Sequence, residues 1–222
     1  MEAPVYYPIF LKIHGKRCVV IGGGQVALRK INALLECGAD IVVISPDLHP
    51  ELSQLAEDRE IKVIYRDYES GDLEGAFIVV AATNRRDINQ KVADEARAQN
   101  ILVNVVDAQE QSDFIIPSLF RRGDLAIAIS TAGGSPALAK KIRTRLEQSL
   151  GEEYTLLLSL IKEVRSVLKE KGILFSADVW QDALDIDLLV RLLQTAQKEK
   201  ARSLLVSNLE ESERRLRRKD NI

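Results

Sequence analysis

The chain has 222 residues, of which 46% are hydrophobic and 29% charged, and its formal net charge is −2 at pH 7. These values are typical of a globular protein with one or two domains, and they exclude the basic excess that binding to nucleic acid or to an anionic membrane surface requires. All apolar runs are shorter than the roughly 20 residues that span a bilayer, and the first residues lack a signal-peptide pattern, so we expect a cytoplasmic protein.

Five short apolar runs predict buried strands in the first half of the chain, because they are rich in valine and isoleucine and show little polar alternation. They are Cys18–Ile21, Ile41–Ile44, Ile61–Tyr65, Phe77–Ala82 and Ile101–Val106. Amphipathic stretches at Val26–Cys37 and Asn84–Gln99 predict helices between strands. A β-α-β alternation of this kind predicts an α/β fold with a parallel, Rossmann-type sheet, which we expect to cover residues 1–111.

The pattern changes after Asp107. The apolar runs Phe114–Phe120 and Leu125–Ser130 flank the turn Arg121–Asp124, and they predict a β-hairpin. In the second run bulky residues alternate with alanine, which predicts one bulky and one small face. Ser135 with the following proline predicts the start of a helix that runs to about residue 150, so residues 112–150 are expected to form a hairpin-helix segment.

Residues 151–222 are expected to form a C-terminal helical domain that packs against the hairpin or a partner chain. A break is predicted near Gly172–Ser176, where glycine interrupts the helical pattern. The stretch Glu210–Asp220 is almost wholly charged and is expected to fray into solvent.

A glycine-rich turn follows the first predicted strand and opens the first predicted helix. The segment Gly22–Ala27 fits the pattern G-x-G-x-x-A, the fingerprint of dinucleotide binding in this setting. Gly22 would make the tight turn, Gly24 would let the backbone approach a pyrophosphate, and the helix N-terminus would face the phosphates. The predicted cofactor residues of this turn are Gly22, Gly23, Gly24, Gln25 and Val26. The alternative is a tight turn without a ligand.

Two further loops are expected to border the cofactor. Pro46 and Asp47 follow the second predicted strand, where an acidic residue binds the adenosine ribose, although Asp47 could instead start the next helix. No lysine or arginine stands at 45–49 to receive a 2′-phosphate, which favours NAD over NADP. Thr83 and Asn84 follow the fourth predicted strand and lie at the same expected sheet edge.

These segments together resemble the precorrin-2 dehydrogenase/sirohydrochlorin ferrochelatase family, the module found at the N-terminus of bifunctional siroheme synthases. The resemblance covers roughly residues 5–150. It is carried by Pro8–Phe10, Val20–Lys30, Ala81–Asn84, Val103–Asp107, Phe114–Ser118 and Ile129–Pro136. The later segments are more specific than the glycine turn. The sequence ends without a methyltransferase domain, so a stand-alone form is expected.

The resemblance implies NAD-dependent oxidation of precorrin-2 to sirohydrochlorin in siroheme synthesis. Many members of the family also insert ferrous iron, which would then be a second substrate. It also implies a homodimer, with residues 112–150 as the dimerisation segment, the hairpin exchanged between subunits and the active site near the interface.

Asp107 is the predicted catalytic residue. It ends the fifth predicted strand, where the nicotinamide end of a dinucleotide is expected, and a carboxylate there can accept a proton. Asp107 also matches the aspartate regarded as catalytic in the family. The alternative is that Asp107 caps a loop, a common role for aspartate.

A loop of small residues precedes the helix predicted at Ser135. We expect its backbone N–H groups to bind carboxylates of the substrate; the loop residues concerned are Ser130, Thr131, Gly133, Gly134 and Ser135. Lys140, Lys141 and Arg143 are expected to add positive charge. The alternative is a flexible turn with no ligand. Thr131 stands where family members carry a serine that can be phosphorylated.

No metal site is expected. His14 and His49 are too far apart in the predicted fold to share an ion, and Cys18 and Cys37 are read as buried small hydrophobes. Two rival functions remain, a regulatory NAD-sensing module without catalysis and a dehydrogenase of another small substrate. A third alternative keeps the family and drops one activity, so that the chain oxidises precorrin-2 without inserting iron.

Overall fold

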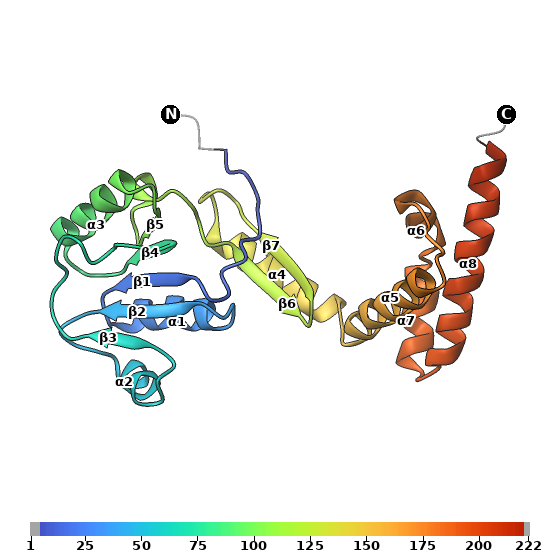
Figure 1. Cartoon of the computed structure of the whole chain (residues 1–222), viewed down its shortest axis with the longest axis horizontal. Coiled ribbons are helices and arrows are strands. Elements are labelled where there is room, and N and C mark those ends of the chain that lie inside the picture. The colour runs from blue at the N-terminus through green and yellow to red at the C-terminus, as the bar shows by residue number, and fades with distance from the viewer. Residues whose placement is uncertain (1–4, 220–222) are drawn as a thin grey trace. The chain divides into compact units, whose positions relative to one another are not determined.

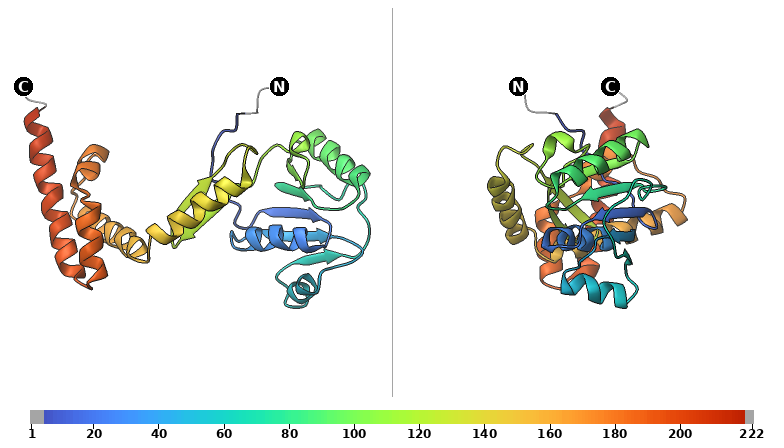
Figure 2. Two further views of the ribbon diagram at one scale, coloured as in Figure 1. Left: turned by 180° about the vertical axis from the view of Figure 1, so that it is seen from behind. Right: turned by 90° about the vertical axis from the view of Figure 1, so that its left-hand side faces the viewer.

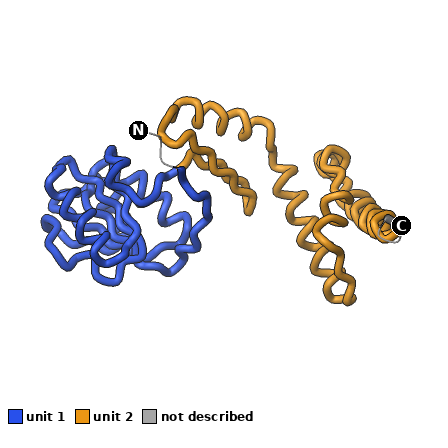
Figure 3. The backbone as a smooth tube through the Cα atoms, turned by 90° about the horizontal axis from the view of Figure 1, so that it is seen from above, with its two compact units in different colours: residues 1–116 blue, residues 117–222 orange. Residues whose placement is uncertain are grey.

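The computed structural model describes residues 5–219 of the chain. The chain divides into two compact units, Met1–Ile116 and Pro117–Ile222, which Figure 3 shows in different colours. The three-part division predicted from the sequence is finer than this one and stays a prediction. Each unit is described by itself.

The first unit is built on a five-stranded parallel sheet with the strand order β3-β2-β1-β4-β5 (Figure 1). The strands are β1 (Arg17–Ile21), β2 (Asp40–Ile44), β3 (Lys62–Ile64), β4 (Ile78–Ala81) and β5 (Leu102–Val105). The helices are α1 (Gln25–Leu35), α2 (Pro50–Glu57) and α3 (Arg86–Ala98). The predicted Rossmann-type sheet is confirmed, with β3, β4 and β5 each one residue shorter than expected at either end.

The sheet is covered on both faces, which explains its apolar strands. One face packs against α3 through Val92, Ala93 and Ala96, and the other packs against α1 and α2 through residues such as Ile31 and Leu52. Cys18 is fully buried in β1, and burial raises the pKa of its thiol to about 11. The thiol therefore stays protonated and acts as a small core residue.

The free edge of β5 is covered by side chains instead of a sixth strand. Ser112 Oγ accepts from Val105 N at 2.9 Å, and the Asp113 carboxylate accepts from Val103 N at 2.9 Å. Asp113 N in turn donates to the carbonyl of Val103, and Phe114 packs against the core cluster on the sheet face that α1 and α2 cover. These groups provide hydrogen-bond partners for the backbone N–H and C=O groups along the outer edge of β5.

The second unit begins with an antiparallel hairpin of β6 (Ser118–Arg122) and β7 (Leu125–Ile129). The prediction that the first hairpin strand begins at Phe114 is wrong. Asp113, just before it, is hydrogen-bonded to Val103 of β5, and pairing within the hairpin starts only with Ser118 opposite Ile129. The turn is tighter than predicted, with Gly123 and Asp124 between the last paired residues.

Helix α4 (Pro136–Ser149) begins at the predicted position and packs against the hairpin (Figures 1 and 2). The four remaining helices are α5 (Glu153–Glu170), α6 (Ala177–Ala183), α7 (Ile186–Gln194) and α8 (Lys198–Lys219). They share a separate core that includes Leu160, Leu189 and Leu205. Among residues 5–219, no helix combines the length and the apolar character that a membrane crossing needs.

The expectation that the chain frays after Glu210 is wrong for the described residues. Helix α8 continues to Lys219, since Ser212 is buried and Leu216 packs against the helical core. The charged residues occupy the remaining faces of the helix, where Arg215 pairs with Asp182 of α6 at 2.8 Å. The predicted break after Gly172 is confirmed, since α5 ends at Glu170 and α6 starts at Ala177.

Candidate functional site

All five parallel strands end level with one another. The register places Ile64, Ile44, Ile21, Ala81 and Val105 side by side as the last paired residues of their strands. The loops that carry the predicted cofactor and catalytic residues of the first unit therefore leave the sheet at the same carboxyl edge. This edge is where open α/β sheets bind ligands.

Within this edge, the strand order reverses between β1 and β4. The glycine turn follows β1, and the loop that begins at Ala82 follows β4, so the two loops flank the switch point. A Cβ atom on Gly22 would lie 2.5 Å from the Ala82 carbonyl oxygen, and Gly22 has a φ of +109°. Only glycine fits this position, for steric and conformational reasons. The predicted role of Gly22 as the tight turn agrees with this geometry.

The next two glycines differ in their surroundings. A Cβ atom on Gly23 would lie 2.3 Å from the Asp47 carbonyl oxygen, because the turn packs against the segment after β2. His49 N donates to the Gly23 carbonyl at 2.7 Å and joins the same two segments. A Cβ atom on Gly24 would meet no atom within 4 Å. The free space of the turn therefore lies at Gly24.

Helix α1 begins at this space with its donors exposed. Its N-cap is Gly24, no side chain caps it, and its first turn carries no acidic residue. Gln25 is exposed and Val26 half-buried at the helix start. A helix N-terminus with open backbone donors and a positive dipole end fits a pyrophosphate. The glycine turn and the start of α1 therefore fit a dinucleotide.

The loop after β2 places Pro46 and Asp47 at the surface. Both residues are exposed, and the carbonyl of Asp47 accepts a hydrogen bond from Ser45 Oγ at 2.7 Å. The N-cap of α2 is His49, whose Nδ1 accepts from Glu51 N at 3.3 Å. Asp47 is therefore not the helix cap, and its carboxylate is free to meet a ligand.

The loop after β4 is held by a residue that the sequence analysis missed. The side chain of Asn89, buried in α3, accepts from Thr83 Oγ1 at 2.7 Å and donates to the Thr83 carbonyl at 3.0 Å. The Thr83 side chain therefore already has a hydrogen-bond partner within the protein, whereas Asn84 is exposed. A polar residue buried on the sheet face of an amphipathic helix was the signal for Asn89.

Asp107 lies two residues beyond β5, level with the loops at the switch point. It is exposed and has a φ of +58°, a region that aspartate tolerates better than most residues. Its carboxylate accepts no hydrogen bond from residues 5–218. Ser112, another residue that the sequence analysis missed, fixes the loop by donating to the carbonyls of Val105 and Ala108. Asp107 therefore presents an unpaired carboxylate on a fixed loop.

In the second unit, the loop before α4 uses its polar groups internally. Ser130 Oγ accepts from Ala132 N, Thr131 Oγ1 accepts from Ser135 N, and Ser135 Oγ caps α4 at Leu138 N. Gly134 N donates to the Thr131 carbonyl at 2.8 Å. Gly133 N has no acceptor within the described part of the chain. The loop is an ordered cap, and its binding of carboxylates stays a prediction.

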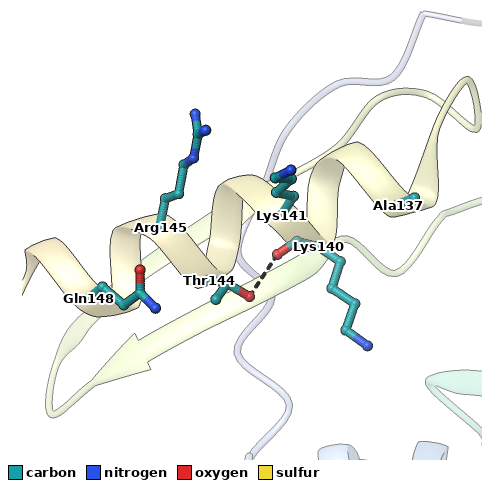
Figure 4. A pocket seen from close by; sticks show the side chains of 6 residues that line it. All are labelled: Ala137, Lys140, Lys141, Thr144, Arg145 and Gln148. Atoms are coloured by element: carbon teal, nitrogen blue, oxygen red, sulfur yellow. Dashed lines mark hydrogen bonds between the residues drawn. The ribbon is translucent and has the colours of Figure 1, made fainter.

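The basic residues of α4 do not converge on this loop. Lys140 and Lys141 are exposed, and Figure 4 shows their side chains pointing in different directions. Arg143 pairs with Glu147. A shallow depression of about 460 Å³ runs along the same helix; it is lined by Ala137, Lys140, Lys141, Thr144, Arg145 and Gln148. Within residues 5–219, no group of three histidine, cysteine, aspartate or glutamate side chains lies close enough to hold a metal ion.

Comparisons with known proteins agree with this geometry. Residues 9–118 match the protein family described as putative NAD(P)-binding, and residues 122–149 match the one described as sirohaem biosynthesis protein central. The first match covers the whole glycine turn and Asp107, and it confirms the predicted dinucleotide-binding domain.

Curated relatives and a solved structure extend the match. A siroheme synthase of Psychromonas ingrahamii is 38% identical over 208 residues, which are 93% of this chain and 44% of the relative. One of Methylobacillus flagellatus is 40% identical over 164 residues, 74% of this chain and 35% of the relative. The structure titled SirC, precorrin-2 dehydrogenase, matches with a TM-score of 0.67 and 26% identity, and the match covers 93% of this chain and all of that one.

The chain thus spans less than half the length of these curated relatives, and both halves of it carry a match. The solved structure confirms the α/β fold with its hairpin and C-terminal helices. Over most of its length the chain is thus similar to siroheme synthases and to a precorrin-2 dehydrogenase, and residues 9–118 match the putative NAD(P)-binding family.

Proposed function

We propose that the chain oxidises precorrin-2 to sirohydrochlorin with NAD as the electron acceptor, a step in siroheme synthesis. The observation that carries the proposal is the free Asp107 carboxylate at the same sheet edge as the open glycine turn. At the usual strand spacing, the loops after β1 and β5 lie roughly 10 Å apart. A dinucleotide whose pyrophosphate lies at the turn can extend over that distance along the edge.

The residues of the first unit take the following roles. The backbone of Gly22–Val26 holds the pyrophosphate, Asp47 binds the adenosine ribose, and Thr83 with Asn84 borders the cofactor from the loop after β4. NAD is the form favoured, because segment 45–49 contains an exposed aspartate and neither lysine nor arginine. When bound, the nicotinamide ring accepts a hydride from the substrate.

Asp107 takes the proton. Oxidation of precorrin-2 removes one hydride and one proton, and the carboxylate of Asp107 accepts the proton without first breaking a hydrogen bond to residues 5–218. Its loop is held by Ser112 and by the bond between Gln109 Nε2 and Tyr6 Oη at 2.7 Å, so the carboxylate stays at the edge. The proposal includes contacts between the substrate carboxylates and the loop before α4, through Ser130, Thr131, Gly133, Gly134 and Ser135.

Ferrous iron insertion at the same residue extends the proposal. Insertion of Fe²⁺ into sirohydrochlorin releases two pyrrole protons, and Asp107 is a carboxylate able to receive them in turn. Iron is a substrate here, held by the macrocycle nitrogens. This second activity shares its base with the oxidation, so the two must be measured separately.

The homodimer is also a proposal, supported by the hairpin. Within residues 5–219, β6 and β7 pair only with each other, which leaves strand edges open, and such a hairpin is marginally stable alone. Leu119 of β6 and Leu138 of α4 are 39% and 51% exposed. Open edges and exposed apolar residues on one segment favour a second copy of the chain as its partner.

The decisive experiment is anaerobic incubation of the pure protein with precorrin-2, with and without NAD and Fe²⁺, followed by absorbance. We expect sirohydrochlorin to form only when NAD is present, and siroheme to form only when Fe²⁺ is added. NAD binding without oxidation of precorrin-2 would favour an NAD-sensing module instead. Turnover of another small substrate, with precorrin-2 left unchanged, would favour the second rival.

A further inference from the structure

Lys30 is a half-buried lysine in α1 that forms no ion pair with residues 5–218. Its helix neighbours three residues before and four after, Ala27 and Leu34, both pack into the core on this face of the sheet. Burial lowers the pKa of its ammonium group, and the nearby charge of Arg29 lowers it further. A lysine is seldom left in such a position without a partner, because desolvation penalises the charged form.

The position of Lys30 relates it to the candidate site. Helix α1 and Val106, the residue before Asp107, pack into the same core cluster, so Lys30 and the Asp107 loop lie on one side of the sheet. The negative charge of Asp107 acts on Lys30 and raises its pKa against the effect of burial. Side chains of a helix lean toward its N-terminus, which for Lys30 is the direction of the glycine turn.

We propose that Lys30 binds an anionic oxygen group of the ligand at this sheet edge, beside Asp107. This inference rests on the proposed function for the ligand's identity. A carboxylate of the tetrapyrrole is the favoured occupant, because Asp107 is proposed to act on that substrate and lies nearby. A phosphate of the dinucleotide is the other anionic group that Lys30 could bind. The ammonium binds either group by charge-assisted hydrogen bonds.

A purely structural role predicts a different response to mutation. Lys30→Met keeps an apolar stem of similar length and removes the charge. If the ammonium serves a ligand, the free protein loses a half-buried charge that has no partner, so its melting temperature stays the same or rises. If the ammonium stabilises the fold, the melting temperature falls.

The test measures binding directly. NAD binding is followed by calorimetry, and sirohydrochlorin binding by anaerobic absorbance titration, for the wild type, Lys30→Met and Lys30→Arg. Lys91→Met is the matched control, because Lys91 is an exposed lysine of α3 on the opposite face of the sheet. We expect Lys30→Met to weaken sirohydrochlorin binding about tenfold, Lys30→Arg to retain most of the affinity, and Lys91→Met to leave both affinities unchanged.

Each outcome decides the proposal. Weaker NAD binding with unchanged sirohydrochlorin binding supports it and assigns the anion to the dinucleotide. Unchanged binding of both ligands to Lys30→Met overturns it, and so does a lowered melting temperature with both affinities reduced. If the wild type binds no sirohydrochlorin, the proposed function fails, and the NAD measurement still decides whether Lys30 binds an anion.

Discussion

Two turns of small residues precede helices in this chain, and the sequence presents both as anion sites. The turn at 22–24 leads into α1, and the loop at 130–135 leads into α4. In the first, Gly24 caps the helix without a side-chain hydrogen bond, whereas in the second Ser135 caps the helix and Thr131 holds the loop. The difference is that hydroxyl groups consume the backbone donors that glycines leave free.

The difference between the two turns favours the sheet edge at the glycine turn as the place of the proposed chemistry. Each region carries a non-glycine residue with a left-handed backbone, Asp107 at +58° and Ala132 at +49°. Asp107 presents a free carboxylate in that conformation, while Ala132 carries no reactive group. We therefore expect the effects of mutation to be larger around the sheet edge than in the loop before α4.

The largest effect is expected for Asp107→Asn. The variant removes the proton acceptor while keeping a side chain that tolerates the left-handed backbone, which alanine would not. We expect precorrin-2 oxidation to fall roughly 10²- to 10⁴-fold, with NAD affinity retained. Glu110→Gln is the control, since Glu110 is an exposed acid three residues away. Wild-type turnover of Asp107→Asn would remove Asp107 from the mechanism.

Gly24→Asp is expected to have the next largest effect, because it places a negative side chain in the open space before α1. No atom lies within 4 Å of the added Cβ, so the fold accommodates it and the melting temperature changes little. Repulsion of the pyrophosphate should reduce NAD affinity at least about a hundredfold, since like charges at close range cost a few kcal/mol. Unchanged NAD affinity by calorimetry would contradict the proposed cofactor position.

Gly23→Ala, one residue earlier, is expected to lower the stability of the fold, which Gly24→Asp leaves nearly unchanged. Its Cβ would lie 2.3 Å from the Asp47 carbonyl oxygen and 2.9 Å from Ser45 Oγ, and the backbone atom cannot move cheaply. We expect a loss of stability of about 1–3 kcal/mol, as for overpacking in a core, measured by denaturant unfolding. Gly24→Ala is the matched control and should unfold like the wild type. Equal stability of the two variants would show that the turn rearranges.

The sequence was sufficient to predict the sheet and the position of its edge. Strands buried on both faces read as apolar runs, and a glycine turn between such a run and a helix has few other structural explanations. The position of Asp107 at this edge was predicted for the same reason, because the end of a strand defines its level in the sheet. The order of the strands then brings it toward the glycine turn. Its catalytic role was favoured by the family resemblance and stays a proposal.

The polar contacts that fix the loops were beyond the sequence. Asn89 holds the loop of Thr83, and Ser112 with Asp113 covers the edge of β5. The helical pattern marks Asn89 as a polar residue on a buried face, but it does not identify the hydrogen-bond partner. The apolar segment from Phe114 reads as a strand, yet it packs beside β5 because side chains, and not a regular ladder, satisfy that edge. Such contacts depend on tertiary position, which spacing alone does not give.

The smallest effect is expected for Ser135→Ala in the loop before α4. The variant removes the hydrogen bond from Leu138 N to Ser135 Oγ, which is 3.2 Å long, so stability should fall by about 1 kcal/mol. Since the hydroxyl is already engaged as a cap, sirohydrochlorin affinity should change less than in Lys30→Met; absorbance titration and denaturant unfolding measure the two quantities. A larger loss of affinity would mean that Ser135 contacts the substrate directly, and the loop would then equal the glycine turn as an anion site.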